Sequence, residues 1–307
     1  MKASAPGKII LFGEHAVVYN RPALAVPVTQ VSVDVEVCDS DSAGIWIHAP
    51  VIDLHAELST LPPDHPIGSV IPRLFQRFDI SHPPDIELKI TSTIPVASGL
   101  GSGAAVSVAL IRALSSFLSH PLENNQINEL VFETEKLHHG TPSGIDNTVI
   151  TYAMPVYFIK GQPIETFKPG KPFTIVIGDT GIPAPTKQSV GDVRRLWLRN
   201  SVHYEDIFDE IGQIALIARR SIESGKPELL GELMDQNHAF LQKLTVSSPE
   251  LDKLVDAARN AGALGAKLSG GGRGGNMIAL VEQARAESVA DALISAGAVR
   301  TIITEVS

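Results

Sequence analysis

Three glycines fall within the seven residues from Ala97 to Gly103, between a strand-like segment that ends near Ile94 and an apolar run that begins at Ala104. A strand, a glycine-rich turn and a helix in this order can present free backbone N–H groups and the positive end of a helix dipole to an anion. Glycine also lets the backbone approach a phosphate and adopt a positive φ. A tight turn that packs the helix closely on the strand is an equally good explanation for this loop alone.

Two common nucleotide motifs can be tested against this loop by their spelling. A P-loop requires a lysine directly after its last glycine, and none follows Gly103. A dinucleotide-binding fingerprint requires a strand-helix-strand unit with an acidic residue at the end of the next strand, whereas a loop and a helix follow here. A nicotinamide-dependent oxidoreductase therefore stays a weak alternative.

A second glycine-rich segment, Lys267 to Gly275, joins two apolar segments that we expect to be strands. It contains far more glycine than a hairpin turn needs. Because adjacent glycines weaken a sheet, we expect something to lie very close to this backbone. A flexible hairpin is the alternative.

Composition limits the class of protein. With 307 residues, of which 44% are hydrophobic, the chain is long enough for two domains with real cores. A formal net charge of -9 argues against nucleic acid or an anionic membrane as partner. Cys38 is the only cysteine, and neither a signal sequence nor an apolar membrane span is evident, so we expect a cytoplasmic protein.

Hydrophobic periodicity separates strands from helices. Alternating valines from Val31 to Val37 and the isoleucine and leucine pattern from Ile86 to Ile90 predict half-buried strands. Residues 104–114 predict a buried helix and residues 125–138 an amphipathic one. Beyond a proline- and glycine-rich patch, a strand at 173–177 and further helices follow, which places a domain boundary near Gly170. An α+β chain fits this order better than regular strand-helix alternation.

Glu135 is the first candidate functional carboxylate. Its spacing from Val131 and Phe132 turns it toward the apolar side of its helix, where an acid needs a cation. A magnesium ion or a structural salt bridge would both satisfy it. Glu135 and His138 also spell Glu-x-x-His, but a di-metal bundle needs two copies and only one is present, so a transition-metal site is disfavoured.

Asp146 is the second candidate functional carboxylate. It follows the turn Thr141-Pro142-Ser143-Gly144, whose proline and glycine restrict the backbone. A carboxylate held on a rigid turn is suited to accept a proton from a hydroxyl. The alternative is that it caps the next element through an Asx turn.

Four blocks of sequence, taken in order, resemble the signature set of the GHMP family of small-molecule kinases. They are the segment from Ala5 to Tyr19, the first glycine loop, the segment from His139 to Asn147, and the last glycine loop. The most specific parts are Gly13-Glu14-His15-Ala16-Val17-Val18-Tyr19 and Pro142-Ser143-Gly144-Ile145-Asp146-Asn147. Thr180-Gly181, Thr186-Lys187 and Val193-Arg194 resemble the start of the family's second domain, so the likeness spans nearly the whole chain.

The resemblance implies an α+β fold of two domains with the site in the cleft between them. Residues 1–170 would form the N-terminal ATP-binding domain, which is similar to domain 2 of ribosomal protein S5. Residues 171–307 would form a ferredoxin-like C-terminal domain. A homodimer is common among such proteins.

The resemblance also implies an activity and the residues that perform it. The chain would transfer the terminal phosphoryl group of ATP, with Mg²⁺, to the 5-hydroxyl of mevalonate, in the synthesis of isoprenoid precursors. Asp146 would accept the proton of that hydroxyl, and Lys8 would lower the pKa of Asp146 or of the hydroxyl. The remaining assignments are Glu14, His15 and Arg194 for substrate, Glu135 and Ser102 for the metal, and Ala97, Ser98, Gly99, Leu100, Gly101, Ser102 and Gly103 for ATP.

This sequence departs from the family's pattern in two places. Gly103 stands where a second serine is usual, so Ser102 or a water must help to hold the metal. Arg273 stands among the late glycines where a small residue is usual; it could hold a phosphate or pack on the surface. A kinase for phosphomevalonate or another small acidic alcohol is the nearest alternative. A regulatory protein without catalysis would be expected to lack Lys8, Glu135 or Asp146, and all three are present.

Overall fold

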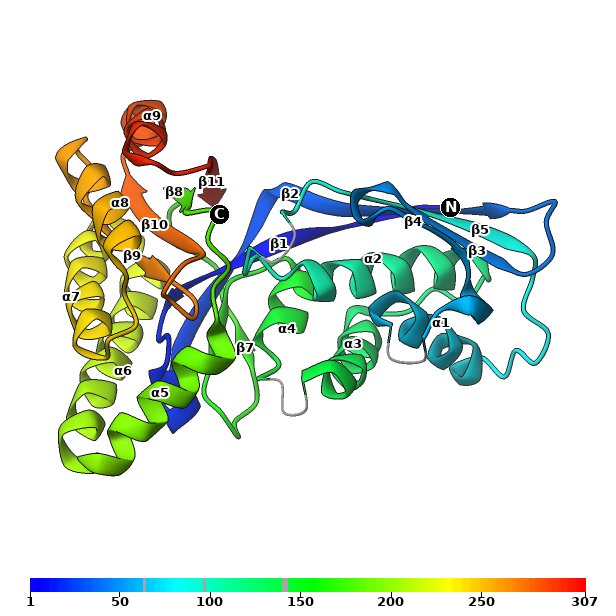
Figure 1. Cartoon of the computed structure of the whole chain (residues 1–307), viewed down its shortest axis with the longest axis horizontal. Helices are drawn as coiled ribbons and strands as arrows, with labels where there is room; N and C mark the ends of the chain where they lie inside the picture. The colour runs from blue at the N-terminus through cyan, green and yellow to red at the C-terminus, as the bar shows by residue number, and fades with distance from the viewer. Residues whose placement is uncertain (63–64, 96–97, 140–142) are drawn as a thin grey trace. The chain divides into compact units, whose positions relative to one another are not determined.

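The computed structural model describes residues 1–62, 65–95, 98–139 and 143–307 (Figure 1). The chain divides into two compact units that interleave in sequence. The first unit contains Met1–Gly7, Val31–Val96 and Gly101–Ala153, and the second contains Lys8–Gln30, Ala97–Leu100 and Met154–Ser307. Each unit combines a sheet with helices, as the α+β prediction requires.

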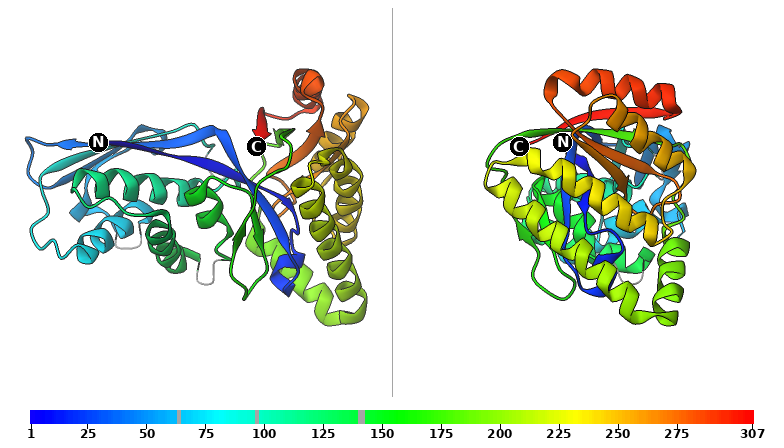
Figure 2. Two further views of the ribbon diagram at one scale, coloured as in Figure 1. Left: turned by 180° about the vertical axis from the view of Figure 1, so that it is seen from behind. Right: turned by 90° about the vertical axis from the view of Figure 1, so that its left-hand side faces the viewer.

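In the first unit a layer of strands is covered by helices on one face (Figures 1 and 2). The strand order is β4-β3-β5-β2, with β3 and β5 parallel and the other pairs antiparallel. The helices α1 to α4 pack on one another below the strands. The elements are β3 (Ile45–Ala49), η2 (Pro50–Ile52), β4 (Leu54–Glu57), η3 (Leu58–Thr60), α1 (Pro66–Arg77), β5 (Ile86–Ser92), α2 (Ser102–Phe117), α3 (Asn124–His139) and α4 (Ile145–Tyr152).

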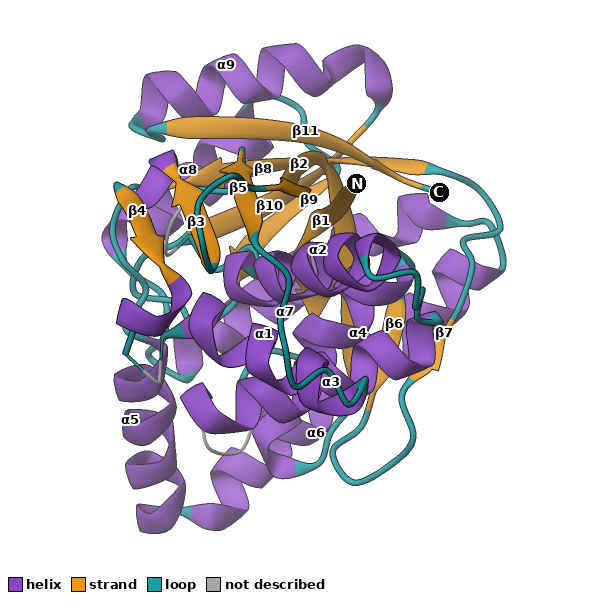
Figure 3. Ribbon diagram, turned by 90° about the vertical axis from the view of Figure 1, so that its right-hand side faces the viewer, coloured by secondary structure: helices purple, strands orange, loops and turns teal. Residues whose placement is uncertain are grey.

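In the second unit a four-stranded antiparallel sheet has the order β11-β8-β10-β9. Helices α7, α8 and α9 pack against it, and α9 runs beside β11 (Figure 3). Strand β6 pairs with β7 and with the first residues of β2. The elements are η1 (Ala16–Tyr19), β6 (Val156–Phe158), β7 (Glu165–Thr166), β8 (Phe173–Asp179), α5 (Thr186–Arg199), α6 (Ser201–Glu223), η4 (Pro227–Leu229), α7 (Leu230–Lys243), α8 (Pro249–Asn260), β9 (Gly265–Ser269), β10 (Asn276–Val281), η5 (Gln283–Arg285), α9 (Ala286–Ala296) and β11 (Arg300–Val306).

Two long paired strands, β1 (Lys2–Phe12) and β2 (Ala23–Asp39), contribute residues to both units. In β2 the valines from Val31 to Val37 are buried, while the polar residues between them are partly or fully exposed, which confirms the predicted alternation. Before Val31 the strand has no such alternation, because residues 23–28 are all buried. Period-two patterning therefore marks only the half of β2 that has one face to solvent.

The predicted helices are confirmed with small shifts of their ends. The apolar run from Ala104 becomes the largely buried helix α2, and the amphipathic segment becomes α3. Ser248 accepts the N–H of Leu251 and caps α8, with Pro249 in the first turn, as its sequence indicates. Leu229 ends the short helix η4 and is 51% exposed.

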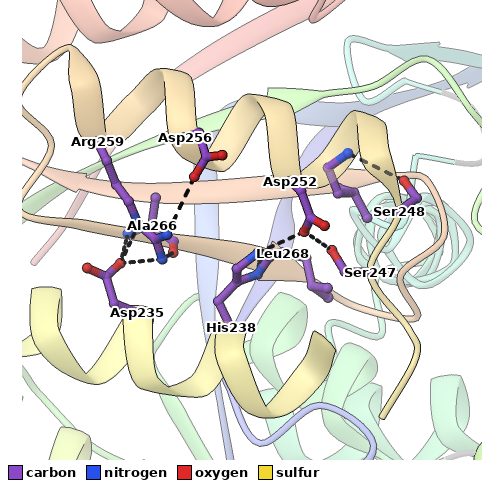
Figure 4. A network of polar contacts seen from close by, with 10 residues as sticks. Asp235, His238, Ser247, Ser248, Asp252, Asp256, Arg259, Ala266 and Leu268 are labelled. Atoms are coloured by element: carbon purple, nitrogen blue, oxygen red, sulfur yellow. Dashed lines mark hydrogen bonds and ion pairs between the residues drawn. The ribbon is translucent and has the colours of Figure 1, made fainter. Parts of the chain in front are cut away.

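Strand β9 lies at the edge of its sheet, and side chains from α7 and α8 bond its outer backbone groups (Figure 4). Asp235 accepts the N–H of Ala266 at 2.9 Å, and Arg259 donates to the Ala266 carbonyl at 3.0 Å. Nδ1 of His238 accepts the N–H of Leu268, while its Nε2 lies 3.0 Å from Asp252. These contacts satisfy an edge that would otherwise offer unpaired groups, and they fix β9 on the helices.

In the part of the chain that the structure describes, each helix is too short or too polar to cross a lipid bilayer. The domain boundary near Gly170 stays a prediction.

The closest approach of α7 to β9 depends on two glycines. A methyl group on Gly265 would collide with the backbone of Gly231, and a methyl group on Gly231 would collide with Leu264. Overpacking of this kind typically costs about 1 to 3 kcal/mol. We expect Gly265→Ala to lower the free energy of unfolding by at least that amount, measured by urea denaturation. Gly191→Ala is the matched control: it lies within α5, its nearest new contact is 3.9 Å away, and it should be neutral or stabilising.

Candidate active site

The chain turns sharply at Gly13, directly after β1, and the polar side chains on both sides of this turn are buried. Gly13 has a φ of +94°, and a Cβ there would lie 2.5 Å from the Cα of Ala23. His15 also has a positive φ, 62°. Lys8, Glu14 and His15 are 7%, 2% and 5% exposed, so this short stretch buries three polar side chains in the second unit.

Glu14 forms a fully buried ion pair with Lys267 of β9, a residue 253 positions away in sequence. The Lys267 ammonium also donates to the Leu268 carbonyl at 2.6 Å. Burial lowers the pKa of Lys267, and the negative charge of Glu14 opposes that shift. Only Oε1 of Glu14 is used, because Oε2 is buried with no hydrogen-bond partner among the described residues. The pair leaves one carboxylate oxygen available for a donor.

Ser269 strengthens the same junction. Its hydroxyl donates to the Ile10 carbonyl at 2.7 Å. Lys267 and Ser269 are two residues apart on β9, so both project from one face of the strand. That face is therefore bonded to the segment that carries Glu14 and His15.

His15 is held in one tautomer. Its Nε2 lies 3.1 Å from the Gly271 carbonyl, and because a carbonyl only accepts, Nε2 carries the proton. Nδ1 is then a buried acceptor, and no described group donates to it. Burial lowers the pKa of His15 to about 4; the Gly271 bond opposes this shift and the charge of Arg273 adds to it. His15 is thus neutral at physiological pH.

The late glycine loop, 270–275, lies very close to other parts of the protein at three of its positions. A Cβ on Gly271, Gly272 or Gly274 would collide with Thr186, Val246 or Ile182, respectively. The expected close approach is confirmed, and at these positions the neighbour is the chain itself. Gly270 differs, because a Cβ there would meet no described atom within 4 Å.

Two positions of the first glycine loop have more space. Among the residues that the structure describes, a Cβ on Gly99 would have only the Asn276 amide within 4 Å, at 3.9 Å, and one on Gly103 would meet no atom. The loop is held at two carbonyls: the Lys8 N–H donates to Leu100 at 2.9 Å, and Asn276 donates to Ser98 at 2.6 Å. Ser102 is the first residue of α2, whose N-cap is Gly101 with a φ of 76°. Open glycines before a helix N-terminus suit an anion.

Arg273 contacts the protein and not open space. Its guanidinium pairs with Asp192 of α5 and donates to the Thr245 carbonyl at 3.2 Å. The hydrogen bond from Arg273 lowers the pKa of Asp192. Of the two alternatives, packing is supported, since this arginine pins the glycine loop to α5.

Arg194 lies exposed on α5. Its helix packs beside Tyr19, since the rings of Tyr19 and of Trp197, which is also on α5, have centroids 5.5 Å apart. Burial raises the pKa of Tyr19, and the charge of Arg194 opposes that shift. Tyr19 itself stacks on Phe208 of α6, with ring centroids 4.0 Å apart. The arginine is therefore close to η1, which directly follows His15.

Asp146 belongs to the first unit and is the second residue of α4, where it is partly buried. The sequence interpretation placed it on a turn or as an Asx cap; the N-cap is instead Gly144, with a φ of 86°. The start of α4 is bonded to α3, since Asn147 donates to Asn128 at 2.7 Å. Thr148 donates back to the Gly144 carbonyl at 2.8 Å. The first turn of α4, which these bonds fix on α3, thus supplies the rigidity that we expected from the turn before Asp146.

Glu135 and Ser102, the expected metal ligands, also lie in the first unit, on α3 and at the start of α2. Both are partly buried, and α2 packs on α3. A carboxylate and a hydroxyl are the oxygen donors that Mg²⁺ prefers. Among the residues described, no three histidine, cysteine or acidic side chains cluster as a metal site by themselves. A magnesium ion here would need phosphate oxygens and waters to complete its shell, which is its usual mode of binding.

The expected site residues divide between the two units. The second contains Lys8, Glu14, His15, Ser98, Gly99, Leu100 and Arg194, and the first contains Gly101, Ser102, Gly103, Glu135 and Asp146. Ala97, Thr141 and Pro142 lie outside the described residues, as does the side chain of His138.

Lys267 and Asn276 are two polar residues at the site that sequence reasoning missed. Each flanks the late glycine loop, and each is buried: Lys267 is 0% and Asn276 3% exposed. A lysine inside an apolar strand was the available signal, because lysine is almost never fully buried without a partner.

Removing the Lys267 charge should destabilise the fold strongly. Lys267→Met leaves the Glu14 carboxylate buried without its cation, and breaking such a pair typically costs about 3 to 5 kcal/mol. We expect that loss in urea unfolding of the variant. The double variant Glu14→Gln/Lys267→Met removes both charges and should recover part of the stability. A single variant as stable as the wild type would mean that the pair is not buried as described.

Because His15 is buried and neutral, we expect the folded protein to lose stability in acid. Its folded pKa of about 4 lies below the ordinary 6.5, so between these values the unfolded chain binds the extra proton and the folded chain does not. Stability contributed by neutral His15 is complete above about pH 6.5 and falls as the pH is lowered toward 4. The loss is roughly 3 kcal/mol at most.

Urea unfolding from pH 7 to pH 4.5 measures this loss. Burial also lowers the pKa of His238, so the wild-type slope contains both groups. His15→Gln should show a shallower slope, and an unchanged slope would contradict the assignment.

Comparison with known proteins identifies the family of the chain. The family model described as the GHMP kinases N-terminal domain matches residues 67–154, and the GHMP kinases C-terminal model matches residues 218–299. A curated mevalonate kinase of Pyrococcus horikoshii is 38% identical over 99% of this chain and 95% of that protein.

Solved structures agree as well. A crystal structure of L. major mevalonate kinase in complex with R-mevalonate has a TM-score of 0.87 and 27% identity, covering 100% of this chain and 96% of that one. The Methanococcus jannaschii mevalonate kinase has a TM-score of 0.85 and 26% identity over 99% and 97% of the two chains. With its two-domain fold of mixed helices and strands, the chain belongs to the GHMP kinase family.

Proposed function

We propose that this protein phosphorylates the 5-hydroxyl of mevalonate, with ATP as phosphoryl donor, to give 5-phosphomevalonate and ADP. The observation that carries the proposal is the pair of buried acceptors on adjacent residues, Oε2 of Glu14 and Nδ1 of His15. A buried acceptor without a donor costs free energy, so a ligand with hydroxyl groups would stabilise both. The full-length likeness to mevalonate kinases supports the choice of alcohol.

On the substrate side, Glu14 and His15 orient the molecule by accepting hydrogen bonds from it. Lys267 holds Glu14 through the ion pair, and the Gly271 carbonyl holds the His15 ring. Because both acceptors are fixed before binding, little entropy is lost when the substrate is positioned. Arg194 supplies a cation near η1 for the substrate carboxylate.

At the reacting hydroxyl, Asp146 accepts the proton as the oxygen attacks the terminal phosphorus of ATP. The bond from that phosphorus to the bridging oxygen breaks, ADP leaves, and Asp146 later releases the proton to water. Lys8 stabilises the negative charge that develops on the attacking oxygen. Positioning and charge stabilisation of this kind carry most of the rate enhancement in phosphoryl transfer.

The phosphates of ATP bind at the first glycine loop and the N-terminus of α2 in this proposal. Mg²⁺ is the proposed cofactor, with Glu135 and Ser102 as its protein ligands; bound there it would neutralise phosphate charge. No atom of the described residues would lie within 4 Å of a Cβ on Gly103, so packing against that part of the chain does not require glycine in place of the family's usual serine. A cytoplasmic location and a homodimer remain predictions.

An ADP-release assay with magnesium and ATP tests the function directly. The purified protein should release ADP with mevalonate, and far more slowly with phosphomevalonate, homoserine or galactose. Release only with phosphomevalonate would overturn the substrate assignment, and release with none of the four would overturn the proposed activity.

Asp146→Asn should lower kcat at least about a hundredfold, because the amide cannot take the proton, while the unfolding midpoint should stay near that of the wild type. Asp53→Asn is a matched control, since Asp53 is exposed in the same unit and its left-handed backbone, with a φ of 51°, suits asparagine. A kcat near the wild-type value in Asp146→Asn would remove Asp146 from the mechanism.

A further inference from the structure

Asn276 is the first residue of β10, an interior strand of its sheet. Its backbone is paired with Ser269 of β9 on one side and with Asp179 of β8 on the other. The side chain is 3% exposed. A side chain on a backbone held from both sides is a rigid anchor for whatever it bonds.

The bond it makes is to the first glycine loop. Nδ2 of Asn276 donates to the Ser98 carbonyl at 2.6 Å, across 178 residues of sequence. The opposite orientation of the amide would place two acceptors against each other, so the donor must face Ser98. Oδ1 is buried and has no partner in the described ranges. A buried amide that makes a single bond carries the cost of an unsatisfied oxygen.

The direction of the Ser98 carbonyl determines the direction of the next N–H. In a trans peptide the C=O and the N–H of one plane point in opposite directions. Because the Ser98 carbonyl points at Asn276, the N–H of Gly99 points away from it. Within the described part of the chain no acceptor takes this N–H.

Two glycines in this region, Gly99 and Gly270, have φ of 78° and 87°, and among the described residues a Cβ on either would have at most one neighbour within 4 Å. Gly99 and Gly101 both have positive φ, and glycine at these two positions puts little steric restraint on rotation of a neighbouring peptide plane. A rotated Ser98–Gly99 peptide would present its carbonyl, and not its N–H, to an anion.

We infer that Asn276 is a positioning residue that holds the Ser98–Gly99 peptide with its N–H directed at the phosphates of the nucleotide. The inference rests on the proposed ATP-dependent function. A donor fixed in advance binds phosphate without reorganisation, whereas a free peptide must first turn its carbonyl away. The neighbouring anchor, from the Lys8 N–H to Leu100, uses backbone groups only, whereas the Asn276 anchor uses a side chain, so a substitution at residue 276 can test it.

The test is equilibrium binding of ADP and MgATP, measured by calorimetry on Asn276→Leu and Asn276→Asp. Both side chains match asparagine in size and neither can donate to Ser98 at neutral pH. We expect nucleotide affinity to fall about tenfold or more in each. The KM for MgATP should rise in parallel, and the KM for mevalonate should change less than twofold. Asn276→Leu removes the unsatisfied Oδ1 but also the donor to the Ser98 carbonyl, so its unfolding midpoint is measured beside the affinity. The aspartate variant provides the second measurement.

Asn237→Leu is the matched control. Asn237 is a fully buried asparagine on α7 in the same unit, and it makes no bond to the loop. Its replacement should leave nucleotide affinity unchanged. Unchanged affinity in both Asn276 variants, or a loss shared equally by nucleotide and mevalonate, would overturn the inference. ADP binding needs no turnover, so it tests the role of Asn276 independently of the proposed substrate. A wild type that binds ADP but does not phosphorylate mevalonate would refute that substrate and leave the Asn276 test valid.

Discussion

The ion pair between Glu14 and Lys267 is the constraint on which the second unit's polar site depends. Removing two charges from water costs several kcal/mol for each ion, and close pairing with further hydrogen bonds is needed to offset it. The Lys267 ammonium has both, because it pairs with Glu14 and donates a hydrogen bond to the Leu268 carbonyl. An alternative packing of β9 against the segment after β1 would leave a buried charge unpaired. The pair thus allows one register, and in that register the second oxygen of Glu14 and the His15 ring are fixed.

Glycines of similar appearance in the sequence perform opposite tasks. Gly271, Gly272 and Gly274 have no room for a side chain because the protein's own backbone fills the space, so they are needed for packing. Gly99 and Gly270 have room and positive φ, so they are needed for backbone conformation or for a ligand. The physical test is what a Cβ would meet. That depends on distant parts of the chain, which is why the number of adjacent glycines predicted close approach but could not say which atoms approach.

The sequence predicted what depends on neighbours along the chain and missed what depends on partners far from it. Period-two valines and the apolar run after the glycines both act within a few residues, and each was found in place. Asp146 lies inside helix α4 and not on a turn as predicted, because the helix begins directly after Gly144, whose φ is 86°.

The residues missed entirely have their partners far away in sequence. The bonds of Lys267 and Asn276 cross 253 and 178 residues, respectively. No local pattern encodes such a partner; only the rarity of a buried lysine or amide signals that one must exist.

One hairpin connects these contacts. Lys267 and the Gly271 carbonyl fix Glu14 and His15, and Asn276 fixes Ser98, so β9, its loop and the first residue of β10 touch both the expected substrate acceptors and the expected phosphate loop. The hairpin is itself restrained: His238 and Asp235 bond its outer edge, and Arg273 ties its loop to α5. A shift of this hairpin would move both sets of groups together. The density of glycine and polar bonds in so short a segment follows from that double task, since phosphoryl transfer tolerates little error in the placement of either reactant.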